Sequence, residues 1–530
     1  MISYLLLLSV LLAPVSASLH LDLLTVTAEE LSFHLGIGHI SSVHLVEQYL
    51  AQIEAHNING LGLRAVIETA PRRQVLDIAG QLDYERRIGK SRGPLHGIPI
   101  LVKDNIATHP ELGMRTTAGS LALEYSLVQD DAVVIAKLRK AGAIILGKTN
   151  MSEWANIRGS FGMIPNGWSA RGGQTQSAYV TGPFNSSERD PSGSSTGSAV
   201  GVSAGFAPLA LGTETDGSIV IAANRAALYG IKATVGAVSA VGVIPVAPKS
   251  MDSVGVMAKS TWDLTTGLGA IVNDEGAGSR YLEALQRGIL TGWDGLKIGV
   301  MDRSVFWDPK TGEYILEASL AAIDKMQSLG AIVSNVTMPS AQKALASHKL
   351  WTKRLIVIQA EFKESLDSYL HTLRNTSIHT LQDLIAFNLD FAAAEMPLGH
   401  CCQEFFIDAL SAHSTNSSTY RSALNVTQSI ARDHGIDYAL RTYDVDVLVA
   451  PTEAPWSSTL AAMAGYPIAT VPLGYINESG RPFGLSFFTG ADGEEMLIRV
   501  LGAWEKEFGR RRVPSALGGQ AGVGGVARLK

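Results

Sequence analysis

Cysteine is almost absent from this chain, which has only two cysteines among 530 residues. The two are adjacent, Cys401 and Cys402, so no disulfide framework is present, and the chain is long enough to rely on a large buried core. A disulfide between neighbouring residues requires unusual geometry. We therefore expect two free, buried thiols here and keep a vicinal disulfide as the less favoured alternative.

Charged residues are also scarce, at 17% of the chain, and the net charge is −6 with no long basic tract. These features argue against nucleic acid as a partner. The 13 histidines form no His-Glu-x-x-His cluster and there is no Cys-x-x-Cys pair. We therefore expect no metal and no other cofactor. The sequence favours no particular oligomeric state.

The apolar run at the N-terminus, residues 5–12, is well short of the ~20 residues that a membrane-spanning helix needs. Pro14 ends the run, and Val15-Ser16-Ala17 supplies small residues for cleavage. Residues 1–17 therefore predict a signal peptide, secretion and no stable membrane anchor.

Glycosylation signals agree with export, because seven asparagines begin an Asn-x-Ser/Thr triplet. Asn150 lies in a segment that we expect near the core, so we expect it to be unmodified. The other six are candidate glycosylation sites: Asn185, Asn335, Asn375, Asn416, Asn425 and Asn477.

Short apolar runs and amphipathic helical periods alternate along the chain. The runs predict strands at residues 97–102, 143–146, 207–211, 296–300, 332–336, 445–450, 468–472 and 483–488. The periods predict helical segments at residues 27–56, 71–88, 313–329 and 494–508. This alternation predicts an α/β fold, a single large domain at residues 27–510 with a central mixed sheet covered by helices on both faces. We expect residues 340–440 to form a peripheral helical region and residues 514–530 a disordered tail.

Lys103 directly follows the apolar run of residues 98–102. A lysine at the end of a buried strand commonly extends its amine to solvent. The alternative is that the amine is desolvated, which lowers its pKa and makes the neutral form available as a base. Taken alone, the position favours exposure.

The first of two serine-rich loops, residues 193–197, matches the Gly-x-Ser-x-Gly nucleophile elbow, with Ser195 as the nucleophile. That motif needs a buried strand before it, whereas residues 185–192 are polar and contain Pro191. The elbow is therefore disfavoured, and a flexible loop explains this segment alone equally well. A small-residue helix predicted at residues 196–204 would present free N–H groups at its start.

The second loop places Ser218 between a predicted strand, residues 207–211, and a small-residue segment, residues 219–227. A serine in such a turn can present its hydroxyl beside free backbone N–H groups, which are the donors that a tetrahedral oxyanion requires. A simple helix cap at Ser218 is an equally good explanation of this segment alone.

Several further motifs accompany the lysine and the two serine loops. They are Gly-Pro-Leu-His-Gly-Ile-Pro-Ile-Leu-Val-Lys-Asp-Asn-Ile (93–106), Arg-Thr-Thr-Ala-Gly-Ser (115–120), Ala-Gly-Ala-Ile-Ile-Leu-Gly-Lys-Thr-Asn-Met-Ser-Glu-Trp-Ala (141–155), Gly-Trp-Ser-Ala-Arg-Gly-Gly-Gln-Thr (167–175), Val-Ala-Pro-Thr (449–452) and Ala-Gly-Tyr-Pro (464–467). By these motifs the chain closely resembles the amidase signature family over residues 27–510. The wording Gly-Thr-Glu-Thr-Asp-Gly-Ser-Ile (212–219) is most similar to the peptide-amidase branch.

The resemblance implies a Ser-Ser-Lys triad. Ser218 would attack the amide carbonyl and form an acyl-enzyme, while Ser194, on a cis peptide bond in this family, would relay the proton to Lys103. The other implied site residues contribute to the oxyanion hole or support the relay: Thr215, Asp216, Gly217 and Ser218 with Ser194 for the hole, and Ser195 and Thr196 for support.

Two positions in the second loop depart from the family pattern. Asp216 stands where much of the family has glycine, and Val220 replaces a frequent arginine. These departures bear on the rigidity of the loop and on substrate choice, since no triad member is lost.

The sequence therefore predicts a secreted serine amidase that hydrolyses the C–N bond of a small or peptide-like amide. A fatty-acid amide hydrolase is one alternative, and such an enzyme would require an apolar patch that faces the membrane. A catalytically silent secreted binding protein of the same fold is another, and the presence of Lys103, Ser194 and Ser218 argues against it.

Overall fold

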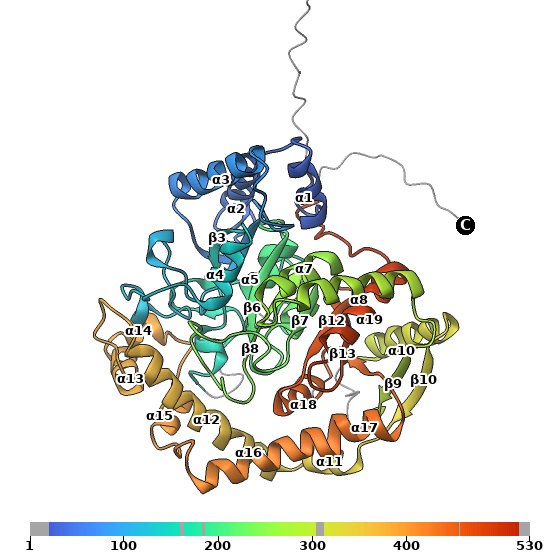
Figure 1. Cartoon of the computed structure of the whole chain (residues 1–530). Coiled ribbons are helices and arrows are strands. Elements are labelled where there is room, and N and C mark those ends of the chain that lie inside the picture. The colour runs from blue at the N-terminus through green and yellow to red at the C-terminus, as the bar shows by residue number, and fades with distance from the viewer. Residues whose placement is uncertain (1–20, 160–163, 183–185, 304–311, 455, 519–530) are drawn as a thin grey trace, which may run out of the picture.

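The computed structural model describes residues 21–159, 164–182, 186–303, 312–454 and 456–518. A mixed sheet of eleven strands forms its centre, and helices flank it on both faces (Figure 1). In spatial order the strands are β1 (Val66–Thr69), β3 (Ile144–Thr149), β2 (Pro99–Lys103), β6 (Leu209–Glu214), β8 (Ser253–Ala258), β7 (Tyr229–Lys232), β12 (Ile468–Tyr475), β13 (Pro482–Phe488), β11 (Val447–Pro451), β9 (Lys297–Met301) and β10 (Ile332–Val336). The predicted α/β fold is confirmed.

The pairing of the strands brings the segments that follow β2, β3 and β6 to one edge of the sheet. β2 lies between β3 and β6 and is parallel to both, whereas β8 is antiparallel to β6 and β7. The carboxyl ends of parallel strands meet at the same sheet edge. Lys103 at the end of β2 and Glu214 at the end of β6 therefore lie at the same edge, next to the loop that follows β3.

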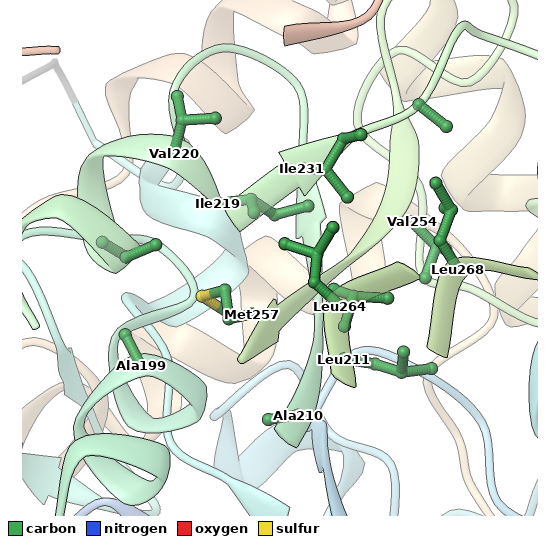
Figure 2. Close-up of a cluster of buried hydrophobic side chains, with 14 of the residues drawn as sticks. Ala199, Ala210, Leu211, Ile219, Val220, Ile231, Val254, Met257, Leu264 and Leu268 are labelled. Carbon is green, nitrogen blue, oxygen red and sulfur yellow. The ribbon is translucent and has the colours of Figure 1, made fainter. Parts of the chain in front are cut away.

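The core packs on both faces of β6, every residue of which is buried. Helix α5 (Thr196–Ser203) contacts β6 through Ser198, whose Oγ donates to the carbonyl oxygen of Leu211. Helix α7 (Thr261–Ile271) also packs against β6 and β8, and Figure 2 shows its Leu264 and Leu268 within the buried cluster that surrounds these strands. Side chains on both sides of β6 thus fix the strand that precedes the second serine loop.

Helices of the remaining fold cover the sheet and its ends. They are α1 (Ala28–Gly36), α2 (Ser42–His56), α3 (Arg72–Arg87), α4 (Val133–Lys140), α6 (Val220–Arg225), α8 (Ala277–Thr291), α10 (Glu313–Ser328) and α19 (Glu494–Phe508), with a small hairpin of β4 (Trp168–Ser169) and β5 (Gly173–Gln174). The helical segment predicted at residues 27–56 is interrupted after Gly36, because Ser41 caps a new helix by accepting the N–H of His44.

The segment between β10 and β11 is helical, as predicted for residues 340–440, and forms one flank of the molecule (Figure 1). Its helices are α11 (Pro339–Leu345), α12 (His348–Leu370), α13 (Leu381–Asp390), α14 (Ala392–Glu395), α15 (Glu404–Leu410), α16 (Ser418–Ala431) and α17 (Asp437–Thr442). Helix α18 (Ser457–Ala464) follows β11 and packs against α16. The buried positions of α12 include Leu350, Arg354, Val357 and Glu361, and this helical spacing directs one face of α12 inward.

The prediction of two free, buried thiols is wrong. Cys401 and Cys402 form a vicinal disulfide, their peptide bond is cis, and both residues are half-buried. The backbone of this loop is held by Arg158, whose side chain donates to the carbonyl oxygens of His400 and Cys402. Arg158 lies far from this loop in the sequence. The contacts that hold the loop therefore cannot be read from the spacing of the two cysteines.

The ends of the described chain bear on two other predictions. The predicted signal peptide, residues 1–17, lies outside the described residues. Pro514 to Gly518, the first residues of the predicted tail, form a turn whose Leu517 packs against the core, and residues 519–530 lie outside the description. Within the described ranges, no helix is long and apolar enough to cross a membrane.

Candidate active site

Lys103 is completely buried at the end of β2. Its Nζ donates to Ser194 Oγ at 2.8 Å and to the carbonyl oxygen of Thr213 at 3.0 Å. The exposed amine that the position alone favoured is therefore not observed. The desolvated alternative is the one that the structure adopts.

Burial lowers the pKa of Lys103 to about 7. The carboxylates of Glu214 and Asp252 oppose this effect, because negative charge favours the protonated amine. A lysine whose pKa lies near neutrality has a substantial neutral fraction at physiological pH. Lys103 can thus accept a proton from the serine hydroxyl that it contacts.

Ser194 lies just before α5 in a loop that is fixed on both sides. Its carbonyl oxygen accepts the N–H of Ser152 at 3.1 Å, and Thr196 Oγ1 donates to the carbonyl oxygen of Ser192 at 2.6 Å. The Gly193–Ser194 peptide bond is cis. Gly197 allows α5 to approach the backbone next to β1 and β3 closely, since a Cβ there would lie 2.2 Å from the carbonyl oxygen of Ala65 and 2.5 Å from the backbone nitrogen of Asn150. The Ser194 hydroxyl is therefore held at one place beside Lys103.

Ser218 ends a sharp turn between β6 and α6, which we call the Ser218 turn (residues 215–218). Gly217 adopts a φ of +82°, a conformation that other L-residues rarely take. The helix-cap alternative is not observed, because α6 begins at Val220 and the N–H groups of Ile219 and Val220 donate to Glu214 Oε2 at 2.6 and 2.9 Å. The carboxylate of Glu214 thus closes the turn and leaves the Ser218 hydroxyl available.

The three side chains form a continuous chain of polar contacts. Ser194 Oγ lies 2.8 Å from Lys103 Nζ on one side and 3.0 Å from Ser218 Oγ on the other. All three residues are at least nine-tenths buried. Hydroxyl groups can rotate to donate in either direction, so a proton can pass from Ser218 through Ser194 to a neutral Lys103.

The backbone N–H groups of the Ser218 turn are free. Within the part of the chain that the structure describes, none of the N–H groups of Thr215, Asp216, Gly217 and Ser218 has an acceptor. Thr215 is held from the side by Asp252, whose Oδ1 accepts the Thr215 hydroxyl at 2.7 Å. Free, fixed N–H groups next to a serine hydroxyl are what stabilisation of an oxyanion requires.

Ser195 does not have the environment of a nucleophile. Its Oγ is completely buried and donates to the carbonyl oxygen of Thr213 at 3.0 Å. Its N–H donates to the carbonyl oxygen of Ser218 at 3.1 Å. Ser195 therefore connects the two serine loops, which agrees with a supporting residue and argues against the elbow interpretation.

A small cavity of about 20 Å³ adjoins the Ser218 turn on the side of Asp252. Its lining is largely apolar and includes Thr215, Val243, Ile244, Pro245, Val246 and Val254. A cavity of this size has room for about one water molecule. It therefore says nothing about the size of the substrate.

Among the residues that the structure describes, no group of three or more His, Cys, Asp or Glu side chains is arranged to hold a metal ion. The polar groups that meet at the site are hydroxyl groups, one amine and backbone N–H groups.

Comparison with known proteins identifies the family. Residues 44–458 match the amidase family. The chain belongs to the amidase signature family. A probable amidase of Arabidopsis thaliana is 36% identical over 92% of this chain and 91% of its own. A putative amidase of Schizosaccharomyces pombe is 34% identical over 90% of this chain and 84% of its own.

A solved structure agrees in fold as well as in sequence. The native peptide amidase of Stenotrophomonas maltophilia superimposes with a TM-score of 0.80 and 36% identity over 92% of this chain and 98% of that one. This amidase is accordingly a hydrolase that acts on amide C–N bonds.

Sequence reasoning missed several residues that shape the site of this amidase. Glu214 closes the Ser218 turn, Ser152 holds the backbone of Ser194, and Asp252 binds Thr215. Glu214 lies within the quoted motif of residues 212–219 and ends β6, so a search for carboxylates at the ends of buried strands would have found it. Asp252 directly precedes β8, which was not among the predicted strands. Arg354, which contacts Asp216, has no such signal.

The asparagines of the seven Asn-x-Ser/Thr triplets fall into three groups. Asn150 is completely buried and its side-chain amide donates to backbone and side-chain acceptors around it. Asn185 lies outside the described residues. The remaining five are exposed: Asn335, Asn375, Asn416, Asn425 and Asn477.

Proposed function

We propose that this amidase hydrolyses small or peptide-like amides through a Ser-Ser-Lys triad of Ser218, Ser194 and Lys103. The observation that carries the proposal is the unbroken contact chain Lys103–Ser194–Ser218 beside the free N–H groups of the Ser218 turn. Burial also lowers the pKa of Lys259 to about 7 away from the site, so what distinguishes Lys103 is its contact with the Ser194 hydroxyl.

The geometry supports the following reaction. Neutral Lys103 takes the proton of Ser194 as Ser194 takes that of Ser218, and Ser218 Oγ bonds to the amide carbonyl carbon. The carbonyl oxygen becomes an oxyanion that accepts the N–H groups of the Ser218 turn. The C–N bond then breaks, and the leaving amine or ammonia receives the proton from Lys103 through Ser194. Water hydrolyses the remaining ester by the same relay and releases the acid.

The preference for small or peptide-like amides rests on the comparison with a solved structure. The similar solved structure is a peptide amidase, and its 36% identity extends over nearly the whole chain. Fatty-acid amides remain the competing substrate class.

A release assay tests both the chemistry and the substrate class. Purified protein is incubated with C-terminally amidated peptides, aryl amides and fatty-acid amides, and ammonia or amine is measured for wild type and Ser218→Ala. We expect turnover of a peptide or aryl amide that is absent in Ser218→Ala. Turnover of fatty-acid amides alone would contradict the substrate class, and equal turnover by Ser218→Ala would contradict the triad.

We also propose that the protein is secreted and glycosylated. The apolar residues 5–12 and the exposure of five sequon asparagines support this proposal. Expression of the full chain in a eukaryotic host should yield protein in the medium whose mass falls on treatment with a peptide N-glycosidase. Retention inside the cell with no change of mass would contradict it.

A further inference from the structure

A carboxylate stands directly beside the place where negative charge develops. Asp216 belongs to the Ser218 turn and is separated from Ser218 only by Gly217. An oxyanion formed on the substrate would be repelled by this carboxylate. A turn that stabilises an oxyanion must therefore offset the charge of Asp216.

Three side chains from two helices hold that carboxylate. Arg354 of α12 forms an ion pair with Asp216 Oδ2 at 2.5 Å, and Thr459 Oγ1 donates to the same oxygen at 2.7 Å. Ser458 Oγ donates to Oδ1 at 2.7 Å. Both carboxylate oxygens are thus bound, and their direction is fixed by groups that lie far from the turn in sequence.

Arg354 is itself held in place. It is 4% exposed, lies on the inward face of α12, and its guanidinium stacks over the ring of Trp351 at 5.0 Å. The guanidinium of Arg354 thus places its positive charge against the Asp216 carboxylate of the Ser218 turn.

Helix α18 contacts the turn at a second point. A Cβ added at Gly217 would lie 3.3 Å from Ser458 Oγ, so the first helical residues of α18 pack directly against the backbone next to Ser218. The donors to Asp216 and the packing against Gly217 come from the same helix. Movement of Asp216 would thus shift the N–H groups that face the substrate.

We propose that Arg354 is a positioning residue of the reaction, which acts through Asp216 to balance its charge and to fix the free N–H groups of the Ser218 turn. The peripheral helices then take part in setting the acylation rate. This inference rests on the proposed function. It also explains how this chain can have aspartate at position 216, where much of the family has glycine. Arg354 of α12 is the counter-ion of that aspartate.

The test measures the second-order rate constant for labelling by a small fluorophosphonate, with the melting temperature of each variant. We expect Arg354→Gln to react about tenfold to a hundredfold more slowly, because the unbalanced carboxylate opposes the developing oxyanion. The double variant Asp216→Asn/Arg354→Gln should recover most of this loss, since it carries no unbalanced charge. Lys349→Gln, an exposed lysine on the same helix, should react like wild type.

Thr459→Val provides a second variant of unchanged shape that removes one donor to Asp216. We expect its rate constant to fall about threefold to tenfold. For both Arg354→Gln and Thr459→Val, the pH midpoint of labelling should stay at that of wild type, because burial, Glu214 and Asp252 are what set the pKa of Lys103. A purely structural defect would instead lower the melting temperature without recovery in the double variant.

The proposal is overturned if Arg354→Gln and Thr459→Val both react at the wild-type rate, or if the double variant is as slow as Arg354→Gln. Should Arg354→Gln not fold, Thr459→Val alone decides. If wild type is not labelled at all, the proposed function has failed. If wild type is labelled at Ser218 and only the expectations for Arg354 and Thr459 fail, the proposed function stands without this inference.

Discussion

Ser194 Oγ lies 3.0 Å from Ser218 Oγ, although the two serines belong to separate loops on either side of α5 and β6. The contact exists because Ser195 binds the loops together: its N–H donates to the carbonyl oxygen of Ser218, and its Oγ donates to that of Thr213. Lys103 Nζ in turn donates to Ser194 Oγ, so the row of polar contacts has three members. Three segments, distant in sequence, therefore meet at one edge of the sheet.

Replacement of Lys103 by methionine should separate activity from stability. Methionine has a similar volume and carries no charge, so it removes the desolvation penalty that lowers the pKa of Lys103 to about 7. We expect labelling by a fluorophosphonate to fall about 10²- to 10⁴-fold while the melting temperature is unchanged or higher. Retention of the wild-type labelling rate would show that Lys103 is not the base.

The pH dependence of labelling follows from the same pKa. Below pH 7 Lys103 is protonated and cannot accept a proton, so the wild-type rate should rise with pH through a midpoint of about 7. Asp252 raises the pKa of Lys103, so Asp252→Asn should move the midpoint to lower pH. Asp274→Asn, at an exposed carboxylate, serves as the control and should leave it unchanged. A midpoint that stays fixed or rises in Asp252→Asn would contradict this assignment.

Two glycine variants separate the effect of disturbing the Ser218 turn on labelling from the general cost of a strained backbone. Gly217 and Gly236 both have positive φ, at +82° and +90°, but only at Gly217 would a Cβ contact neighbouring atoms, the nearest 2.5 Å away on Ile221. We expect both alanine variants to lose about 1 kcal/mol of unfolding free energy. Labelling should slow about tenfold or more in Gly217→Ala alone. Equal labelling rates for the two variants would remove the turn from the mechanism.

The vicinal disulfide predicts the behaviour of the two cysteines. Iodoacetamide should add no label to the denatured, unreduced chain, and two labels after reduction, as read by intact mass. Alkylation without reductant would show that Cys401 and Cys402 are free thiols.

Many elements of the fold could be predicted because they have local signals, but β1, β7 and β8 were not predicted. Strands such as β2 and β6 are short apolar runs, and α19 follows a clear helical period that predicted its limits. Lys103, Ser194 and Ser218 could be selected as candidate site residues because they stand in motifs that resemble a known family. Without the resemblance, the position of Lys103 favoured exposure, since nothing in the local sequence shows that residues from other loops cover it.

What could not be predicted depends on contacts between distant segments. The ion pair of Asp216 and Arg354 joins a turn to a helix 138 residues later, and no local pattern marks either residue as the partner of the other. The loop of Cys401 and Cys402 is similarly held by Arg158, 244 residues before Cys402. An element that has its own periodicity can be predicted from the sequence. A loop whose backbone is held by a side chain distant in sequence can be described only from the folded structure.

Peptide mapping by mass spectrometry after reaction with a fluorophosphonate tests the role of Ser218 most directly. We expect a single adduct on Ser218 in wild type, none in Ser218→Ala, and about a hundredth of the wild-type amount or less in Lys103→Met over the same short reaction time. An adduct on Ser195, or undiminished labelling of Ser218→Ala, would contradict this role.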